Sequence, residues 1–305
     1  SKEACARHFA DTFIHADFDN RKGLERLCQI SDVVTFEFEN IDSDLLAELE
    51  KDYHIVQSAS LLKTAQHRLL EKEFARSLGI ETVDYQYVDQ DTTGVQVDGT
   101  YLMKTVRFGY DGKGQSRITE ASQVQPYTLL ERLVPLDKEI SVVAYKDRTG
   151  IGIVAVVENE HRHNILYRSI VPTTASPEQE AQAIDYTRRI LEAADYYGVL
   201  TVEFFISQGR VIFNEMAPRV HNSGHITMQS ANKSQFRAHI EAICGLEVGP
   251  IHNQATTLYN ILGQDLDYFL KLIQQGPAHL HLYEKEPRQD RKIGHINFPG
   301  HIRLE

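Results

Sequence analysis

The stretch 214–225, NEMAPRVHNSGH, decides the fold of this chain when it is read together with Glu203 upstream. Glu203 and Glu215 lie in two adjacent apolar runs, residues 199–206 and 211–216, which are separated by the linker Ser207-Gln208-Gly209-Arg210. A short polar linker containing Gly between two such runs predicts an antiparallel β-hairpin. In such a hairpin the two carboxylates can sit on neighbouring strands and face one pocket.

Two carboxylates facing one pocket suit Mg²⁺, which binds one or two carboxylates and takes further ligands from water and substrate phosphates. The alternative for either glutamate alone is a solvent-facing strand residue, because strand carboxylates are usually at the surface. Two glutamates in register, followed at once by Arg219, His221 and Asn222, favour a metal-nucleotide site beside an anion site.

The composition of the whole chain limits its partners. The 305 residues are 42% hydrophobic and 25% charged, which is ordinary for a globular protein. A net charge of −11 without a long Lys/Arg cluster argues against nucleic acid as the main partner. No apolar run is long enough to cross a bilayer, no signal peptide opens the sequence, and the three cysteines form no paired motif. We therefore expect a cytoplasmic protein with no membrane partner.

The first part of the chain is typical of the remainder of an α/β unit whose start is missing. Strands and helices alternate there, which implies a parallel sheet, over residues 12–15, 22–30, 33–38 and 43–53. A strongly amphipathic helix is predicted from Leu61 to Leu78, with Leu69, Leu70, Phe74 and Leu78 on one face and Gly79 as its stop.

The middle and end of the chain predict an antiparallel sheet followed by helices and two short strands. Strands are expected at 101–104, 127–134, 140–146 and 151–157, helices at 177–197, 234–244 and 265–275, and final strands at 279–283 and 295–298. We divide the chain into an N-terminal α/β domain (1–57), a central domain of two subdomains (58–247) and a small C-terminal domain (248–305).

A glycine-rich loop follows Lys104, which ends an apolar strand. In the segment RFGYDGKG, Gly109, Gly112 and Gly114 allow close backbone approach, so that successive N–H groups can point at phosphate oxygens. The loop is neither a Walker loop nor a dinucleotide fingerprint, and an ordinary β-turn would have a similar composition. Lys104 favours the phosphate interpretation because it places a cation on the preceding strand.

Two further segments carry charges at useful positions. Apolar residues before Glu131 and Glu139 can form an adenine slot with a carboxylate for the ribose, although a sheet edge with ordinary charges explains the residues alone better. Near the end, Lys285 and Arg291 belong to a basic cluster that suits a phosphate monoester, and the alternative is a solvated turn. The 14 histidines show no compelling zinc or iron spacing.

With these residues assembled, the sequence resembles the ATP-grasp superfamily and, within it, the 5-(carboxyamino)imidazole ribonucleotide synthetases of purine biosynthesis. The resemblance rests on four segments that occur in the family's order: DVVTFEFEN (32–40), GYDGKG (109–114), residues 214–225, and RKIGH (291–295). It implies an α/β and α+β enzyme with the ATP-grasp fold, an N-terminal parallel α/β domain and a small C-terminal domain. It also implies ATP, Mg²⁺, bicarbonate and aminoimidazole ribonucleotide as ligands, and a homodimer.

The resemblance assigns roles to individual residues. The expected magnesium ligands are Glu203 and Glu215. The expected nucleotide contacts are Arg68, Lys104, Gly109, Tyr110, Gly112, Lys113, Gly114, Glu131, Glu139, His161 and Asn214. The residues expected around the ribonucleotide and bicarbonate are Asp111, Arg219, His221, Asn222, Lys285 and Arg291, of which Asp111, Arg219, His221 and Asn222 are the catalytic candidates.

The sequence departs from the family pattern in three ways. It lacks the family's opening strand and Gly-rich turn, it stops soon after Gly294-His295, and Phe108 stands where the loop often has another Gly. Two alternatives stay open. One is another ATP-grasp ligase, such as a formate-dependent glycinamide ribonucleotide transformylase, and the other is an inactive ATP-binding subunit.

Overall fold

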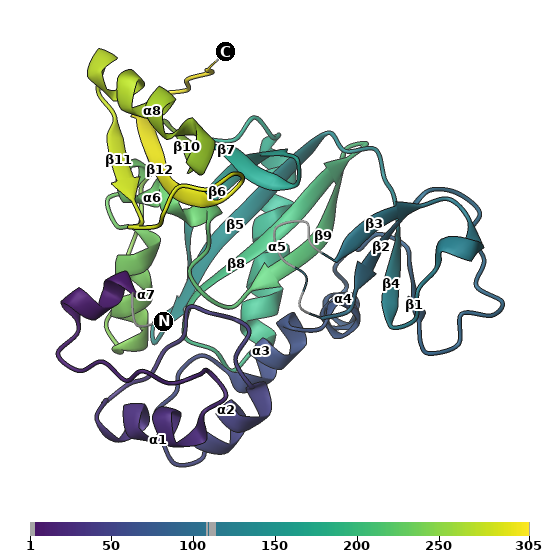
Figure 1. Ribbon diagram of the computed structural model, residues 1–305, viewed down its shortest axis with the longest axis horizontal. Coiled ribbons are helices and arrows are strands. Elements are labelled where there is room, and N and C mark those ends of the chain that lie inside the picture. Colours follow the sequence, from purple (N-terminus) through teal and green to yellow (C-terminus); the bar gives the residue numbers. More distant parts are fainter. Residues whose placement is uncertain (1–3, 108, 110–113, 305) are drawn as a thin grey trace.

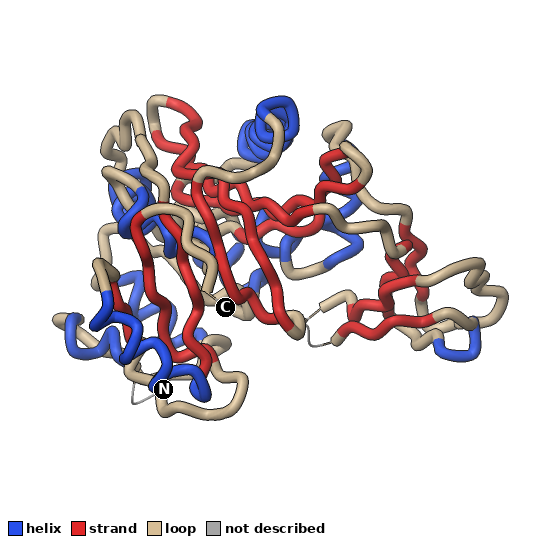
Figure 2. Tube along the Cα trace, turned by 90° about the horizontal axis from the view of Figure 1, so that it is seen from above, coloured by secondary structure: helices blue, strands red, loops and turns tan. Residues whose placement is uncertain are grey.

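The computed structural model describes residues 4–107, 109 and 114–304, and it builds them around two antiparallel β-sheets (Figure 1). The larger sheet has eight strands in the order β11-β12-β10-β7-β6-β5-β8-β9, and the smaller has four in the order β1-β4-β2-β3. In Figure 2 the small sheet stands apart from the large one, to which loops connect it. The predicted antiparallel strands are confirmed, but they divide between two sheets instead of forming one.

The strands of the large sheet come from the middle and the end of the chain. They are β5 (Lys138–Asp147), β6 (Gly150–Arg162), β7 (Ile165–Val171), β8 (Gly198–Ser207), β9 (Arg210–Ala217), β10 (Thr256–Leu262), β11 (His279–Leu282) and β12 (Lys292–Pro299). The sequence did not predict β10, which pairs with both β7 and β12. Through β10, the C-terminal strands extend the sheet that carries the central site.

The predicted hairpin is present as β8 and β9. Its turn residues Gln208 and Gly209 have φ angles of 50° and 82°. Two successive positive φ angles are the geometry of a type I′ turn, whose twist matches that of the flanking strands. The turn sets a register in which Phe204 faces Phe213, and a one-residue bulge in β9 then makes Glu203 and Glu215 direct partners across the hairpin.

Helices cover both faces of the large sheet. α5 (Pro177–Ala193) begins at Ser176 in a capping box with Gln179 and packs on one face. α7 (Gln235–Ile243), capped by Ser234, packs on the other. α5 lies against the even-numbered positions of β8, from Leu200 to Ile206, so the odd-numbered positions face the opposite side.

The small sheet consists of β1 (Tyr85–Val88), β2 (Tyr101–Thr105), β3 (Gln115–Ile118) and β4 (Thr128–Arg132). Its own small core includes Val88, Met103, Ile118 and Leu130. β2 pairs with β3 and β4, so Lys104 lies at the centre of this sheet, opposite Gln115 and Leu129.

The N-terminal part contains helices but little β-structure. α1 (Arg21–Gln29) and α2 (Ser43–Leu49) agree with the predicted helices, although α2 ends earlier than predicted. The predicted strand at 33–38 makes a single parallel bridge, Val34 to Ile55, and the predicted strand at 12–15 is wrong. Residues 12–15 are mostly exposed, so nothing buries their apolar side chains as a strand would require.

The predicted helix from Leu61 to Leu78 is two helices, α3 (Ala59–Ala65) and α4 (Arg68–Ser77). The chain breaks between them because the N–H of Arg68 donates to the carbonyl of Val106 instead of continuing the helix. Gly79, with a φ of 69°, follows the end of α4 as predicted. The predicted apolar face is correct in part, since Phe74 and Leu78 pack against the core, but Leu70 is exposed while Glu71 and Lys72 are buried.

The remaining helices are short. They are α6 (Thr227–Ser230), α8 (Leu266–Leu272) and the 3-10 turns η1 (Cys5–Phe9), η2 (Ala121–Gln123), η3 (Ser223–Ile226), η4 (Gly263–Asp265) and η5 (Ile273–Gln275). In the part of the chain that the structure describes, no helix has both the length and the apolar character needed to cross a membrane.

Candidate active site

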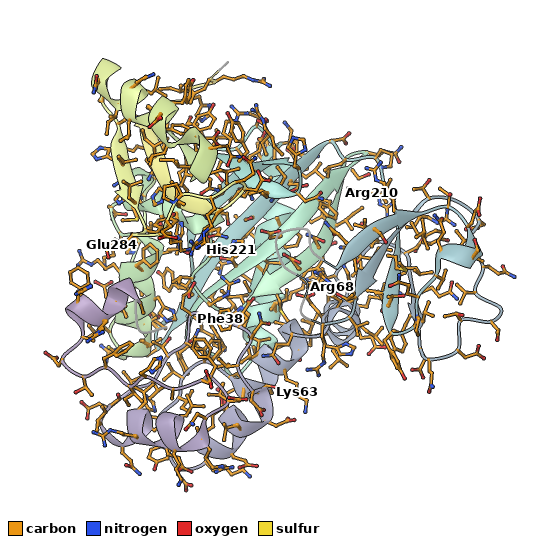
Figure 3. All side chains as sticks on the ribbon, in the orientation of Figure 1. Phe38, Lys63, Arg68, Arg210, His221 and Glu284 are labelled. Carbon is orange, nitrogen blue, oxygen red and sulfur yellow. The ribbon has the colours of Figure 1, made fainter. Side chains whose placement is uncertain are left out.

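A cavity of ≈ 580 Å³ lies between the two sheets. This size is in the usual range for a small-molecule site. Figure 3 labels Arg68 and His221, which line the cavity from α4 and from the segment after β9. The cavity brings together predicted residues from distant parts of the chain: Arg68, Lys104, Gly109, Glu131, Glu139, His161, Glu203, Asn214, Glu215, His221 and Asn222.

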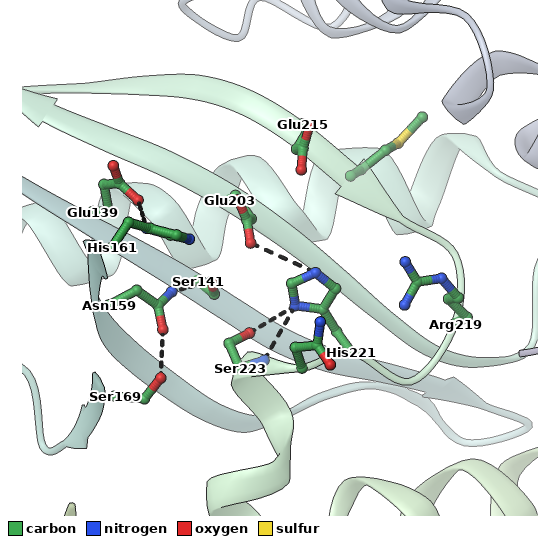
Figure 4. A network of polar contacts seen from close by, with 12 residues as sticks. Glu139, Ser141, Asn159, His161, Ser169, Glu203, Glu215, Arg219, His221 and Ser223 are labelled. Atoms are coloured by element: carbon green, nitrogen blue, oxygen red, sulfur yellow. Dashed lines mark hydrogen bonds and ion pairs between the residues drawn. The ribbon is translucent and has the colours of Figure 1, made fainter. Parts of the chain in front are cut away.

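The two predicted metal ligands occupy facing positions on β8 and β9 (Figure 4). Burial raises the pKa of Glu203 to about 8, and the nearby charge of Glu215 adds to this effect. Desolvation also opposes ionisation of Glu215, but Arg68 and Lys104 lower the pKa of that carboxyl below its usual value. The guanidinium Nη1 of Arg68 is 3.2 Å from Glu215 Oε2. The two carboxylates therefore share one site in which their charges repel each other.

Lys104 and Glu131 form a buried ion pair at the small-sheet side of the cavity. Lys104 Nζ is 2.6 Å from Glu131 Oε2, and both side chains are almost fully buried. Lys72 Nζ approaches the other carboxylate oxygen, Oε1, at 3.4 Å. Burial opposes ionisation of Glu131, but the two lysines lower its pKa to about 2. Glu131, predicted as a nucleotide contact, thus also holds the predicted phosphate lysine in place.

Only the two ends of the glycine-rich loop lie within the described residues. Arg68 Nη2 donates to the carbonyl of Gly109 at 3.5 Å, and the carbonyl of Gly114 accepts from the N–H of Thr105 at 2.8 Å. The predicted residues Tyr110, Asp111, Gly112 and Lys113 lie outside the described residues.

Glu139 and His161 pair at the end of the cavity away from Arg219. His161 Nδ1 lies 2.5 Å from Glu139 Oε2, from the facing strands β6 and β5. Burial alone would lower the pKa of His161, but the hydrogen bond and charge of Glu139 raise it above its usual value.

Apolar side chains line the cavity elsewhere, including Val83, Leu102, Leu133, Val134, Leu136, Leu166 and Phe205.

A second cavity of ≈ 160 Å³ adjoins the first on the other side of the carboxylates. Its lining includes Arg219, which is absent from the larger cavity, and shares Glu203, Glu215, His221 and Asn222 with it. Arg219 Nη2 donates to Glu39 Oε2 at 3.0 Å. The paired carboxylates therefore stand at the boundary between two spaces.

The segment after β9 is fixed by Gln235, which is fully buried on α7. Its Oε1 accepts from the N–H of His221 at 2.9 Å, and its Nε2 donates to the carbonyl of the same residue at 2.7 Å. His221 Nε2 then lies 3.6 Å from Glu203 Oε1, and its Nδ1 is 2.9 Å from Ser223 Oγ. Burial and the charge of Arg219 lower the pKa of His221 to about 3, so the imidazole is neutral.

The two predicted C-terminal cations are not brought to either cavity. Lys285 is exposed, with its Nζ 5.5 Å from the ring centroid of Tyr283, and Arg291 is exposed and donates to the carbonyl of Glu286 at 3.3 Å. Their neighbour Lys292 reaches the site instead, with Nζ 2.6 Å from Asn222 Oδ1.

Sequence reasoning gave no role to Lys72, Lys292, Gln235 and Glu39. The position of Lys72 could have been found, because it follows Arg68 by one helical turn and so shares its face of α4. Lys292 is adjacent to a predicted residue, and Glu39 lies in a segment that carried the family resemblance. The role of Gln235 has no sequence signal, since it depends on the docking of α7 beside the segment after β9.

Comparison with known proteins identifies the class to which this fold and site belong. The model of the ATP-grasp domain matches residues 73–236, that of the ribonucleotide synthetase preATP-grasp domain matches 1–66, and that of the phosphoribosylaminoimidazole carboxylase C-terminal domain matches 256–303. The chain therefore belongs to the ATP-grasp superfamily, whose members are defined by the fold described above.

Individual relatives narrow this assignment. The N5-carboxyaminoimidazole ribonucleotide synthase of Brucella melitensis is 36% identical over 95% of this chain and 85% of its own length. The crystal structure of the N5-carboxyaminoimidazole synthetase from Staphylococcus aureus with ADP has a TM-score of 0.90 at 33% identity, covering 97% of this chain and 84% of that one. The chain belongs to the N5-carboxyaminoimidazole ribonucleotide synthase family.

A further solved structure contains a nucleotide together with the expected ribonucleotide. It is the Aspergillus clavatus N5-carboxyaminoimidazole synthase with ADP and 5-aminoimidazole ribonucleotide, with a TM-score of 0.87 at 25% identity, covering 95% of this chain and 83% of that one. The predicted family, fold class and kind of enzyme, an ATP-dependent ligase, are confirmed.

Proposed function

We propose that this chain uses ATP and bicarbonate to carboxylate the exocyclic amine of 5-aminoimidazole ribonucleotide, giving the N5-carboxyamino derivative in purine biosynthesis. The observation that carries the proposal is the position of Glu203 and Glu215. They lie at the boundary between a cavity that contains Lys104 and a smaller one that contains Arg219. This arrangement suits a nucleotide on one side and its acceptor on the other.

The carboxylate pair fits Mg²⁺ by its donor chemistry. Burial and, after it, the charge of Glu215 raise the pKa of Glu203, so an ionised pair is costly here, and a divalent cation would offset that cost. The buried Oδ1 of the adjacent Asn214 has no hydrogen-bond partner among the described residues. Glu203 and Glu215 would hold the ion, which when bound neutralises charge on the nucleotide phosphates.

Side chains of this protein bind the other parts of the nucleotide. Lys104 and Arg68 offer positive charge to the phosphates, and the apolar lining near Leu133 receives the base, with Glu139 at the sugar. Because phosphoryl transfer asks for positioning and charge neutralisation, no side chain needs to act as a nucleophile. The γ-phosphate passes to bicarbonate and leaves ADP. The amine then attacks the carboxyphosphate, or CO₂ released from it, so that the bond from carbon to the phosphate oxygen breaks, inorganic phosphate leaves and the amine loses a proton. The glycine-rich loop is proposed to exclude water during this step.

The second cavity is proposed to receive the acceptors. Arg219 supplies charge for bicarbonate, and the neutral His221 can accept a proton from the reacting amine. Asn222 contributes polar contacts, Asp111 takes part in orienting the amine, and Lys285 and Arg291 bind the phosphate of the ribonucleotide. Since Lys285 and Arg291 stand outside both cavities, this last role requires them to approach when the ribonucleotide binds.

An ADP-release assay with each co-substrate omitted in turn tests the proposal. ADP should form only when bicarbonate and the ribonucleotide are both present. Turnover with formate in place of bicarbonate would instead indicate the transformylase type of ligase. Calorimetric binding of Mg-ATP without any ADP formation would indicate an inactive binding subunit.

The variant Glu215→Gln tests the metal assignment within the same assay. It should nearly abolish turnover, whereas Glu160→Gln, on β6 and outside both cavities, should leave it unchanged. An unchanged rate in Glu215→Gln would contradict the proposed metal site. The proposal also includes that the protein forms a homodimer and is located in the cytoplasm. Sedimentation of the purified protein measures its oligomeric state.

A further inference from the structure

The strand β9 contains an irregularity at the site. Glu215 pairs with Glu203 and Phe213 pairs with Phe204, so the intervening Asn214 has no partner residue across the hairpin. Consecutive strand residues normally point to opposite faces, and a β-bulge breaks this alternation. Here the bulge lets Asn214 and Glu215 both line the large cavity, while Phe213 packs in the core against Phe204.

Lys72 supports this bulge from the helix α4. Its Nζ donates to the carbonyl of Asn214 at 2.7 Å and to the carbonyl of Phe213 at 3.3 Å. A buried backbone carbonyl that leaves the regular ladder needs another donor, and a charged donor is a strong one. The side chain of Lys72 is only 1% exposed, so these contacts are shielded from bulk solvent.

The same ammonium group also reaches the small sheet. It lies 3.4 Å from Glu131 Oε1, and the other oxygen of that carboxylate is 2.6 Å from Lys104 Nζ. One buried cation therefore contacts the strand that carries Glu215 in the large sheet and, through Glu131, the lysine of the small sheet. These are the two sides between which the nucleotide phosphates are proposed to lie.

A buried lysine is costly, and this cost indicates what the residue does. Removing an ammonium group from water costs several kcal/mol by order of magnitude, whereas a methionine would fill a similar volume without that cost. Packing therefore does not explain why a lysine occupies this position. The contacts that its ammonium group makes do.

We propose that Lys72 is a positioning residue for magnesium-nucleotide binding, which fixes the bulge at Asn214 and the orientation of Lys104 together without touching the nucleotide. The inference rests on the proposed function, because it assumes that the nucleotide binds at this cavity. In this proposal the helix α4, through Lys72, connects the two sheets across the cavity.

Calorimetric titration with ADP, with Mg²⁺ and with EDTA, tests the inference on Lys72→Met. The expected result is at least a tenfold rise in the Kd for ADP in Mg²⁺ and a smaller change in EDTA. A lysine that served folding alone would lower the fraction of protein able to bind, and hence the stoichiometry, while leaving the Kd unchanged. In steady-state assays the KM for ATP should rise about tenfold. The KM for the ribonucleotide should stay within about twofold.

Lys146→Met is the matched control. Lys146 Nζ also donates to two backbone carbonyls, those of Leu191 and Ala194, each at 2.8 Å, and it lies outside both cavities. This variant should keep the wild-type Kd for ADP even if its stability falls. An equal loss of affinity in both variants would overturn the inference, since it would show a general effect of removing a lysine that holds backbone carbonyls.

The outcomes separate the inference from the function on which it rests. Wild-type protein that binds no ADP would overturn the proposed function and this inference with it. Wild-type protein that binds ADP no more tightly than Lys72→Met would overturn the inference alone. If Lys72→Met does not fold, Lys72→Arg decides, because a planar guanidinium cannot place one compact charge against both carbonyls and Glu131. A tenfold loss of affinity in folded Lys72→Arg supports the inference, and an unchanged Kd overturns it.

Discussion

Replacing Glu131 with glutamine should destabilise the fold strongly, and by an amount that depends on pH. Among the described residues, Glu131 is the carboxylate that pairs with both Lys72 and Lys104, and its side chain is 4% exposed. The variant leaves two buried ammonium groups without their counter-charge. Breaking a buried ion pair by removing one partner costs roughly 3–5 kcal/mol.

The pKa of Glu131 gives a second estimate of the free energy of unfolding that this substitution removes. The folded state lowers this pKa from 4.5 to about 2. Each unit corresponds to about 1.4 kcal/mol, so the ionised carboxylate contributes roughly 3 kcal/mol at neutral pH. Because the folded pKa is depressed, this stability is present above pH 4.5 and is lost as the pH falls toward 2. The difference between wild type and variant should therefore shrink by roughly 1.5 kcal/mol between pH 7 and pH 3.5.

Urea unfolding followed by circular dichroism at both pH values measures this difference. The control is Glu48→Gln, which removes an exposed partner of Arg21 and should change the unfolding midpoint little at either pH. A difference for Glu131→Gln below about 1 kcal/mol at pH 7, or one that does not change with pH, would contradict the reasoning. Either result would mean that Glu131 is not held as an ionised group between the two lysines.

Three further predictions follow from other parts of the structure. Gly114→Ala should weaken ATP binding in calorimetry, because residue 114 has a φ of 73° and its Cβ would lie 2.5 Å from Thr105 Oγ1; unchanged affinity would contradict this. Lys285→Ala should raise the KM for the ribonucleotide and leave that for ATP unchanged, and a normal ribonucleotide KM would refute the role of Lys285. His239, whose Nδ1 accepts from the N–H of Val199, has its pKa lowered to about 4 by burial. The unfolded state alone therefore takes up this proton between pH 6.5 and 4, and wild-type stability should fall in that range while His239→Gln loses this part of the pH dependence.

The parts of the fold that local sequence determines could be predicted. The hairpin of β8 and β9 follows from its apolar runs and its two-residue turn, and α5 follows from Ser176, Pro177 and Gln179 at its start. These signals lie within a few residues of the structure that they specify. The same turn places the two glutamates near each other on neighbouring strands, which is why the carboxylate pair could be proposed from sequence alone, but their direct pairing depends on the bulge in β9.

The errors arise where a contact with a distant segment decides the local structure. The break between α3 and α4 depends on the carbonyl of Val106, and the inward face of α4 depends on partners for Glu71 and Lys72 at the end of β9. A prediction from the helical spacing of apolar residues places charged side chains at the surface. It does so because the spacing contains no information about a distant residue that could pair with a buried charge. The same limitation explains why the segment 101–170 was predicted as one sheet instead of two.

Asn214 shows how these two kinds of information combine at the site. Strand alternation, which is a local rule, would point Asn214 and Glu215 to opposite faces, so the sequence pattern alone argues against both residues serving one ligand. Both line the cavity because the strand bulges, and the bulge carbonyl is held by Lys72 from a helix far away in the sequence. The role predicted for Asn214 came from family resemblance, and the structure supplies the physical condition under which that role is possible. Any change that restores regular pairing of β9 should therefore remove either Asn214 or Glu215 from the cavity, whatever side chains remain.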